Sequence, residues 1–100
     1  MNTFQNNYDT VEQIIFENGL RIKAVHFHVD MDLMLIVLNN KKVIQRNIAS
    51  SPRLARATLE NLKNYRLIAG GVGIHWPDVD EDLSLKGFIK EEILQGEFGR

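Results

Sequence analysis

The alternation of apolar and polar residues predicts three consecutive strands in the first half of the chain. Over residues 22–29 apolar and polar positions alternate, which predicts a half-buried strand with His26 and His28 on its polar face. Residues 33–38 are apolar at every position, which predicts a central strand covered on both faces. Alternation resumes over residues 43–48, and short turns separate the three segments. The pattern therefore predicts an antiparallel meander of three strands.

Helix-capping residues mark the start of three further segments. They predict helical structure over residues 11–17, 52–67 and 85–94. Within the second segment Thr58 is expected to cap a new helix, and Ser84 is expected to cap the third segment. The first segment is rich in residues that favour strands, so a strand stays open there as the alternative.

A fourth strand is expected between the second and third helical segments. Val72, Ile74 and Trp76 share one parity, and Pro77 ends the strand. This parity places the tryptophan in the core and His75 on the outward face. The predicted fold class is α+β, with a small antiparallel sheet (a three-stranded meander plus a fourth strand) packed against two or three helices.

Length and composition indicate one globular domain. The chain has 100 residues, of which 44% are hydrophobic and 25% charged, as is usual for a folded soluble domain. We expect a single domain over residues 10–94, between a flexible arm at 1–9 and a flexible tail at 95–100. The longest apolar run, residues 33–38, is too short to cross a membrane, and residues 1–7 resemble no secretory signal. These features predict a cytoplasmic protein without a membrane partner.

Candidate chemistry gathers in the acidic segment that follows the tryptophan. The absence of cysteine excludes disulfides, thiolate metal sites and cysteine nucleophiles. The carboxylates of residues 78–82 lack the spacing of an EF-hand loop, and no nucleophile elbow is present. We therefore predict no catalytic residue, no cofactor and no metal site. A small metal-dependent hydrolase centred on His75 and this acidic turn is kept as the second alternative function.

The outward patch beside the acidic turn is expected to bind a protein partner instead. It combines an outward histidine with a dense run of acids next to a buried tryptophan. The predicted partner-binding residues are His75, Asp78, Asp80 and Glu81.

The basic residues are segregated, although the formal net charge is only −1. Residues 41–66 carry seven basic side chains against Glu60, and both flanking segments are acidic. A basic surface can bind nucleic-acid phosphates. The candidate contacts are Lys41, Lys42, Arg46, Arg53, Arg56, Lys63 and Arg66. No aromatic residues are interleaved as in single-strand binding surfaces, so a nucleic-acid-binding regulator is the first alternative rather than the main prediction.

Several short motifs together resemble a known family. They are Ser51-Pro52-Arg53-Leu54, Ala57-Thr58, Asn64-Tyr65, Gly73-Ile74-His75-Trp76-Pro77 and Asp80-Glu81-Asp82-Leu83-Ser84, followed by Phe88. In this order and spacing, over about residues 22–90, the set resembles the bacterial domain of unknown function 2442. Leu59 departs from the pattern, because a proline commonly follows the Ala-Thr pair in that family.

The resemblance implies a small α+β domain without established catalytic residues. Members of the family are often encoded beside another small uncharacterised protein, in an arrangement reminiscent of toxin–antitoxin pairs. The main prediction is therefore a non-enzymatic protein-interaction module, the antitoxin-like or regulatory partner of a neighbouring small protein. A homodimer is also compatible with so small a core.

Overall fold

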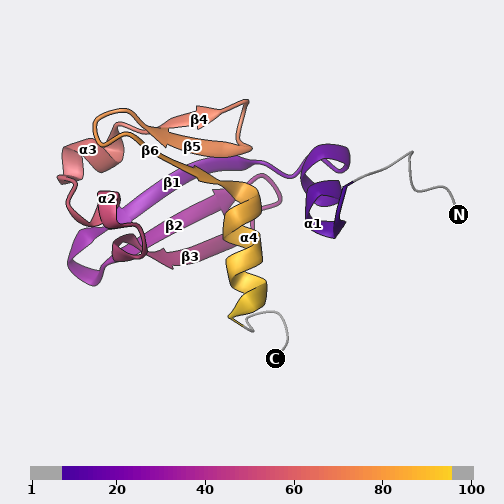
Figure 1. The fold of residues 1–100 in the computed structure, drawn as a ribbon, viewed down its shortest axis with the longest axis horizontal. Helices are drawn as coiled ribbons and strands as arrows, with labels where there is room; N and C mark the ends of the chain where they lie inside the picture. The colour runs from indigo at the N-terminus through magenta and orange to yellow at the C-terminus, as the bar shows by residue number, and fades with distance from the viewer. Residues whose placement is uncertain (1–7, 96–100) are drawn as a thin grey trace, which may run out of the picture.

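Two small antiparallel sheets and four short helices make up the computed structural model, which describes residues 8–95 (Figure 1). Sheet A is formed in the order β1-β2-β3 by β1 (Ile22–His28), β2 (Leu33–Leu38) and β3 (Val43–Asn47). Sheet B is formed in the order β4-β5-β6 by β4 (Arg66–Ile68), β5 (Gly73–Trp76) and β6 (Glu81–Ser84). The helices are α1 (Thr10–Glu12), α2 (Pro52–Ala55), α3 (Leu59–Lys63) and α4 (Leu85–Leu94). Short helical turns are η2 (Gln13–Glu17), η3 (Val29–Met31) and η4 (Ile48–Ser50). The predicted α+β class is confirmed.

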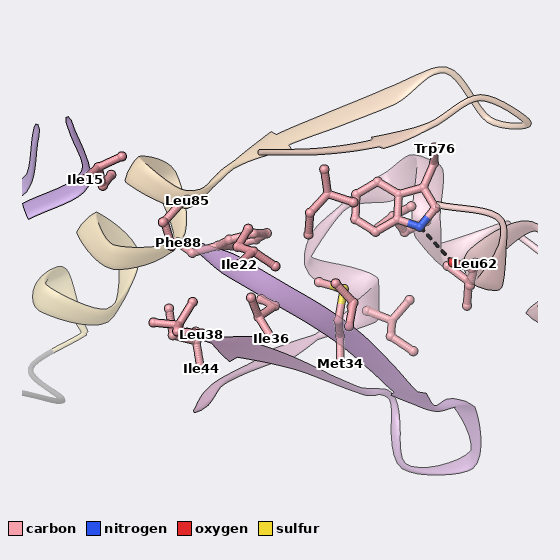
Figure 2. Packing of buried hydrophobic residues seen from close by; sticks show 14 of the residues in the cluster. Ile15, Ile22, Met34, Ile36, Leu38, Ile44, Leu62, Trp76, Leu85 and Phe88 are labelled. Carbon is pink, nitrogen blue, oxygen red and sulfur yellow. Dashed lines mark hydrogen bonds between the residues drawn. The ribbon is translucent and has the colours of Figure 1, made fainter. Parts of the chain in front are cut away.

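Sheet A is the predicted meander, but it is covered on one face. Met34, Ile36 and Leu38 of the central strand are buried, whereas the three residues between or before them are half-buried. Sheet B and α4 lie on the side of these buried residues (Figures 1 and 2). The prediction that residues 33–38 are covered on both faces is therefore wrong for one face.

Sheet B contains the predicted fourth strand and two strands that the sequence pattern did not predict. The helix expected to run to residue 67 ends at Lys63, and Arg66–Ile68 pair instead with β5. The segment expected to be an acidic turn begins β6 at Glu81. The fourth strand thus lies at the centre of a second sheet rather than in the meander.

The core lies between the inner face of sheet A, sheet B and α4 (Figure 2). Trp76 is fully buried, as predicted, and its indole Nε1 donates a 3.0 Å hydrogen bond to the carbonyl oxygen of Leu62. A buried tryptophan needs such a partner for its N–H group, because an unpaired polar group in the core is costly. The bond joins the end of β5 to α3.

The capping residues of α3 and α4 are those that the sequence predicted. Thr58 accepts a hydrogen bond from the Asn61 backbone N–H at 3.1 Å, and Ser84 accepts one from the Gly87 backbone N–H at 2.9 Å. Residues 11–17 are helical rather than extended, and Asp9 caps α1.

The two predicted flexible ends fall largely outside the described residues. Residues 1–7 and 96–100 lie there, while Asp9 of the expected arm takes part in the fold as the cap of α1. Within residues 8–95, none of the helices combines the length and apolar character that crossing a membrane requires.

Gly71 joins the two sheets. The backbone N–H of Ile22 donates to the Gly71 carbonyl oxygen at 2.8 Å. Gly71 has φ +126°, and a Cβ atom built on it would collide with the backbone of Ile22. The close approach therefore requires glycine at this position.

Candidate functional site

The predicted partner-binding residues all lie along the connection from β5 to β6. His75 is on β5, Asp78 and Asp80 are in the turn, and Glu81 begins β6. The structure therefore brings them together, and it also gives each of these side chains a partner within the chain.

Asp78 fastens the turn to the segment that contains α3. Its Oδ2 atom accepts hydrogen bonds from Asn64 Nδ2 at 3.0 Å and from Asn61 Nδ2 at 3.4 Å. Both amides come from the last turn of α3 or its C-cap. Together with the indole bond to Leu62, they hold α3 against the end of sheet B.

Glu81 and Asp80 fasten the same connection to α2. Ser51, which is 3% exposed, donates from Oγ to Glu81 Oε2 at 2.6 Å. The guanidinium of Arg53 donates to the carbonyl oxygen of Asp80 and lies 3.6 Å from its Oδ2 atom. The first contact is part-buried and the second is exposed, so the serine–glutamate bond contributes more to the attachment.

His75 pairs with Asp82, which the sequence reasoning did not select. The two residues are cross-strand partners of β5 and β6, and His75 Nδ1 lies 2.5 Å from Asp82 Oδ1. Arg66 of β4 is the register partner of His75 on its other side. A hairpin prediction over residues 73–84 would have aligned this pair, but the acidic sequence of β6 hides the strand.

The histidine–aspartate pair resembles the orienting half of a catalytic triad, because the carboxylate fixes the imidazole. Its neighbour in the same cross-strand row is an arginine, which is no nucleophile. Among residues 8–95, no group of three or more His, Asp or Glu side chains is placed to hold a metal ion. The hydrolase alternative therefore stays a prediction, and His75 with Asp82 is the histidine–carboxylate pair that it would use.

The basic residues proposed for nucleic acid are spread over the molecule. Arg46 lies beneath α4, with Nε 3.1 Å from Glu91 Oε1 and its guanidinium carbon 5.4 Å from the centre of the Phe88 ring. Lys41 and Lys42 are at the β2–β3 turn, at the opposite end of sheet A from α2 and α3 (Figure 1). The remaining candidates on or beside α2, α3 and β4 are Arg53, Arg56, Lys63 and Arg66. Nucleic-acid binding stays a prediction, with these four residues as its most compact group.

A charge cluster ties the N-terminal helix to α4. Lys86 Nζ lies 2.6 Å from Glu12 Oε2, and Lys90 Nζ lies 3.1 Å from Asp9 Oδ2. The Lys86 ammonium lowers the pKa of Glu12, and the Glu12 backbone N–H, followed by Lys90, lowers that of Asp9. The hydrogen bond to Glu12 in turn raises the pKa of Lys86. The contacts span more than 70 positions of sequence, which is why the pattern of either helix did not reveal them.

The outer face of sheet A differs from the acidic β5–β6 connection in having no carboxylate among its residues. It is formed by Ala24, His26, His28, Leu33, Leu35, Val37, Val43, Gln45 and Asn47. None of these nine residues is Lys, Arg, Asp or Glu, although the exposed Lys23 lies beside Ala24 at the bulge of β1. No described helix or strand lies over the nine residues (Figure 1). Val43 is 48% exposed, and the three aliphatic residues of β2 are half-buried.

Two shallow hollows flank this face. One, of about 580 Å³, borders β1, and the other, of about 440 Å³, borders β3. The first is lined by Val25, His26, Phe27, His28, Leu35 and Lys63. The second is lined by Leu33, Val43, Gln45, Arg46, Asn47, Glu92 and Gln95. An aliphatic centre between polar margins is the usual layout of a protein-binding surface.

The fold and these surfaces define a small α+β domain made of two antiparallel sheets. Side chains of the β5–β6 connection are hydrogen-bonded to other parts of the domain, whereas no described element covers the outer face of sheet A. A sequence model of the family described as "Protein of unknown function (DUF2442)" matches residues 22–93. The chain belongs to this family.

Solved structures of similar fold come from two bacteria. A protein of unknown function from Rhodospirillum rubrum is 23% identical, with a TM-score of 0.64 over 74% of this chain and 89% of that one. An uncharacterized protein from Chromobacterium violaceum is 19% identical, with a TM-score of 0.66 over 90% of this chain and 82% of that one. These similarities establish the fold. No protein of curated function matches the chain.

Proposed function

We propose that the protein is a non-catalytic interaction module that binds another protein chain through the outer face of sheet A. The observation that carries the proposal is the central strand, whose outward residues Leu33, Leu35 and Val37 are all aliphatic and lack a covering element within residues 8–95. An antiparallel sheet with one solvated face normally alternates apolar inward and polar outward residues. Here the central strand is apolar on both faces, which supports a partner as the missing cover.

The energetic reason is the removal of apolar surface from water. Burial contributes about 25 cal/mol per Å² of apolar surface, and contiguous exposed apolar patches mark binding sites more often than isolated apolar residues do. The three aliphatic side chains of β2 are continuous with Val43 of β3, which is the register partner of Val37. We call Leu33, Leu35, Val37 and Val43 the aliphatic strip. A partner that covers this strip gains affinity without requiring a charged contact.

The heterologous partner that we propose is a small protein encoded beside this one, for which the chain acts as the regulatory or antitoxin-like half. The family resemblance supports this choice. His75, Asp78, Asp80 and Glu81 stay predicted contacts for such a partner, because Asp78 and Asp80 are exposed beside their internal bonds.

Co-expression with the product of the adjacent gene tests the proposal. We expect a complex that survives gel filtration, and we expect Leu35→Glu to abolish it by placing a charge in the centre of the face. Ile68→Glu is the matched control, because Ile68 is an exposed aliphatic residue on a strand of sheet B. Failure to co-purify would remove the neighbour's product as the partner, and equal binding by both variants would contradict the proposed role of the face.

A further inference from the structure

We infer that the chain covering the outer face of sheet A is a second copy of the same protein, packed face to face about a two-fold axis parallel to β2. The inference rests on the proposed function and names the partner of the same surface. In such a dimer each copy covers the aliphatic strip of the other, and the strip itself forms the centre of the interface.

The face is suited to its own copy because none of its nine residues is Lys, Arg, Asp or Glu. Two copies of a charged patch repel each other when they meet, and burying unpaired charges is unfavourable. The nine residues of the face are aliphatic, amide or histidine side chains. Self-association therefore brings no like charges of these nine residues together.

The register of sheet A arranges these nine residues in three rows across the strands. The rows are Ala24-Val37-Val43, His26-Leu35-Gln45 and His28-Leu33-Asn47. Each row has an aliphatic residue of β2 at its centre. The first row is entirely apolar, whereas each of the other two has histidine at the β1 end and an amide at the β3 end.

A two-fold axis parallel to β2 places β1 of one copy over β3 of the other and keeps each row on its own counterpart. His26 then lies over Gln45 of the partner subunit, and His28 lies over Asn47 of the partner subunit. Ala24 lies over Val43 of the partner subunit. Imidazole meets amide and aliphatic meets aliphatic at every position, so both polar groups find hydrogen-bonding partners on closure.

A two-fold axis running across the strands gives a poorer match. It reverses the order of the rows and leaves each strand over its own counterpart. Ala24 would then lie over His28 of the partner subunit, and Val43 over Asn47 of the partner subunit. His28 and Asn47 would then lose water against apolar side chains, which costs free energy. The row pattern therefore selects the axis parallel to β2.

The size of the face sets the expected strength of the dimer. Three strands about 4.8 Å apart, each rising about 3.3 Å per residue, give a footprint of roughly 15 Å by 20 Å. Stable standard interfaces bury about 1,600 Å² in total, so this face forms a smaller interface of the weak, transient class. Aligned sheets at about 10 Å separation and about −30° would accommodate it.

Sedimentation velocity from about 1 to about 500 μM protein tests the dimer. We expect a monomer–dimer equilibrium for the wild-type chain. Leu35→Glu lies close to the axis and would place two carboxylates together, so this variant is expected to stay monomeric throughout. Val43→Glu, at a more exposed position, provides a second variant whose folding is less affected. Ile68→Glu should dimerise like the wild type.

Cross-linking tests the direction of the axis. The chain has no cysteine, so single cysteines report contacts without background. His26→Cys and Gln45→Cys, treated with a short bis-maleimide, should cross-link when the two variants are mixed and much less when each is alone. An axis across the strands would instead join each variant to its own copy, and this result would overturn the proposed arrangement.

The outcomes separate the inference from the function on which it rests. A wild-type chain that is monomeric at every concentration overturns the second-copy assignment. The proposed function still stands in that case if the neighbour's product binds and Leu35→Glu prevents it. A dimer that persists in folded Leu35→Glu and Val43→Glu also overturns the assignment. A dimer lost in both variants, without binding of the neighbour's product, supports the assignment and removes the heterologous partner.

Discussion

The two sheets of this domain use their side chains in opposite ways. Along the β5–β6 connection of sheet B, the carboxylates of Asp78, Glu81 and Asp82 are each bonded to a side chain elsewhere in the fold. On the outer face of sheet A, the central residues are aliphatic and lie open. The polar side chains of the β5–β6 connection thus mainly stabilise the fold. The aliphatic outer residues of β2 are the better candidates for binding a partner.

This contrast also explains the motifs on which the family resemblance depends. Ser51 bonds Glu81, Trp76 bonds the Leu62 carbonyl, and Tyr65 accepts a 3.0 Å hydrogen bond from the Val25 backbone N–H. These contacts all join segments that are distant in sequence. Assembly of the fold therefore accounts for the presence of these residues in the motifs.

The largest loss of stability is expected from Trp76→Ala, because the indole fills the junction between sheet B and α3. Truncating a buried tryptophan costs about 3–5 kcal/mol, and it also leaves the Leu62 carbonyl unpaired. Urea unfolding followed by circular dichroism measures the change, since the chain's single tryptophan is lost as a probe. Trp76→Phe keeps most of the volume and should cost about half as much; a loss below about 1 kcal/mol for Trp76→Ala would contradict the assigned role.

Gly71→Ala should have the next largest effect, because it disrupts the backbone contact between Gly71 and Ile22 that joins the two sheets. The added Cβ collides with the Ile22 backbone at a φ of +126°, and a cost of about 2–4 kcal/mol follows if the strands shift apart. Gly19→Ala is the matched control, since Gly19 also has a positive φ, +79°, but no atom within 4 Å of the built Cβ. It should lose about 1 kcal/mol, and equal losses for the two variants would show that the contact is unimportant.

Ser51→Ala tests the hydrogen bond from Ser51 to Glu81 that attaches α2 to β6. Removing a buried hydroxyl that bonds a carboxylate costs about 1–3 kcal/mol, because Glu81 Oε2 loses its 2.6 Å partner. Ser50→Ala, at the exposed neighbouring position, should change the unfolding free energy by less than about 0.5 kcal/mol. Thermal unfolding of the two variants side by side gives the difference, and similar midpoints would argue against this fastening.

The sequence pattern identified sheet A, the fourth strand, the buried tryptophan and the caps of α3 and α4, because these depend on local parity or on one capping residue. It missed β4 and β6, because their strand structure comes from pairing with β5 rather than from intrinsic preference. Glu81-Asp82 is a poor strand former by itself. The helix predicted over residues 52–67 likewise ran past Asn64, where the backbone leaves the helical conformation.

The candidate site was harder to predict than the fold. The open face required knowledge of which side of sheet A the rest of the chain covers, and six consecutive apolar residues do not contain that information. The His75–Asp82 pair required the register of a hairpin that the pattern did not show. Pairing partners and layer order are tertiary properties, so they followed only from the three-dimensional arrangement.

The stability of the contact between α1 and α4 should fall both at acid pH (the acid limb) and at alkaline pH. Asp9 and Glu12 have lowered pKa values in the fold, so their contribution is present above the unfolded-state values and is lost as the pH falls through the folded ones, below about pH 4. Lys86 has a raised pKa, so its contribution is lost as the pH rises through the folded value, above about pH 10. Hydrogen exchange of the α1 amides at pH 3 and pH 7 measures the acid limb. Lys86→Gln should diminish it, and an unchanged limb would contradict the pairing.

The smallest effect is expected on the outer face of sheet A, where two adjacent residues of β3 provide a matched pair. Val43 is 48% exposed and points outward, whereas Ile44 is 7% exposed and points into the core. Val43→Thr keeps the branched shape and should change monomer stability by less than about 0.5 kcal/mol, while Ile44→Thr buries a hydroxyl and should cost about 2 kcal/mol. Measured at low micromolar concentration, this difference reports the monomer alone. At higher concentration a dimer raises the wild-type unfolding midpoint by mass action, and Val43→Thr should weaken that increase. Equal losses for the two variants in the monomer would mean that the outer face is covered within the chain itself, and the contrast between the two sheets would then fail.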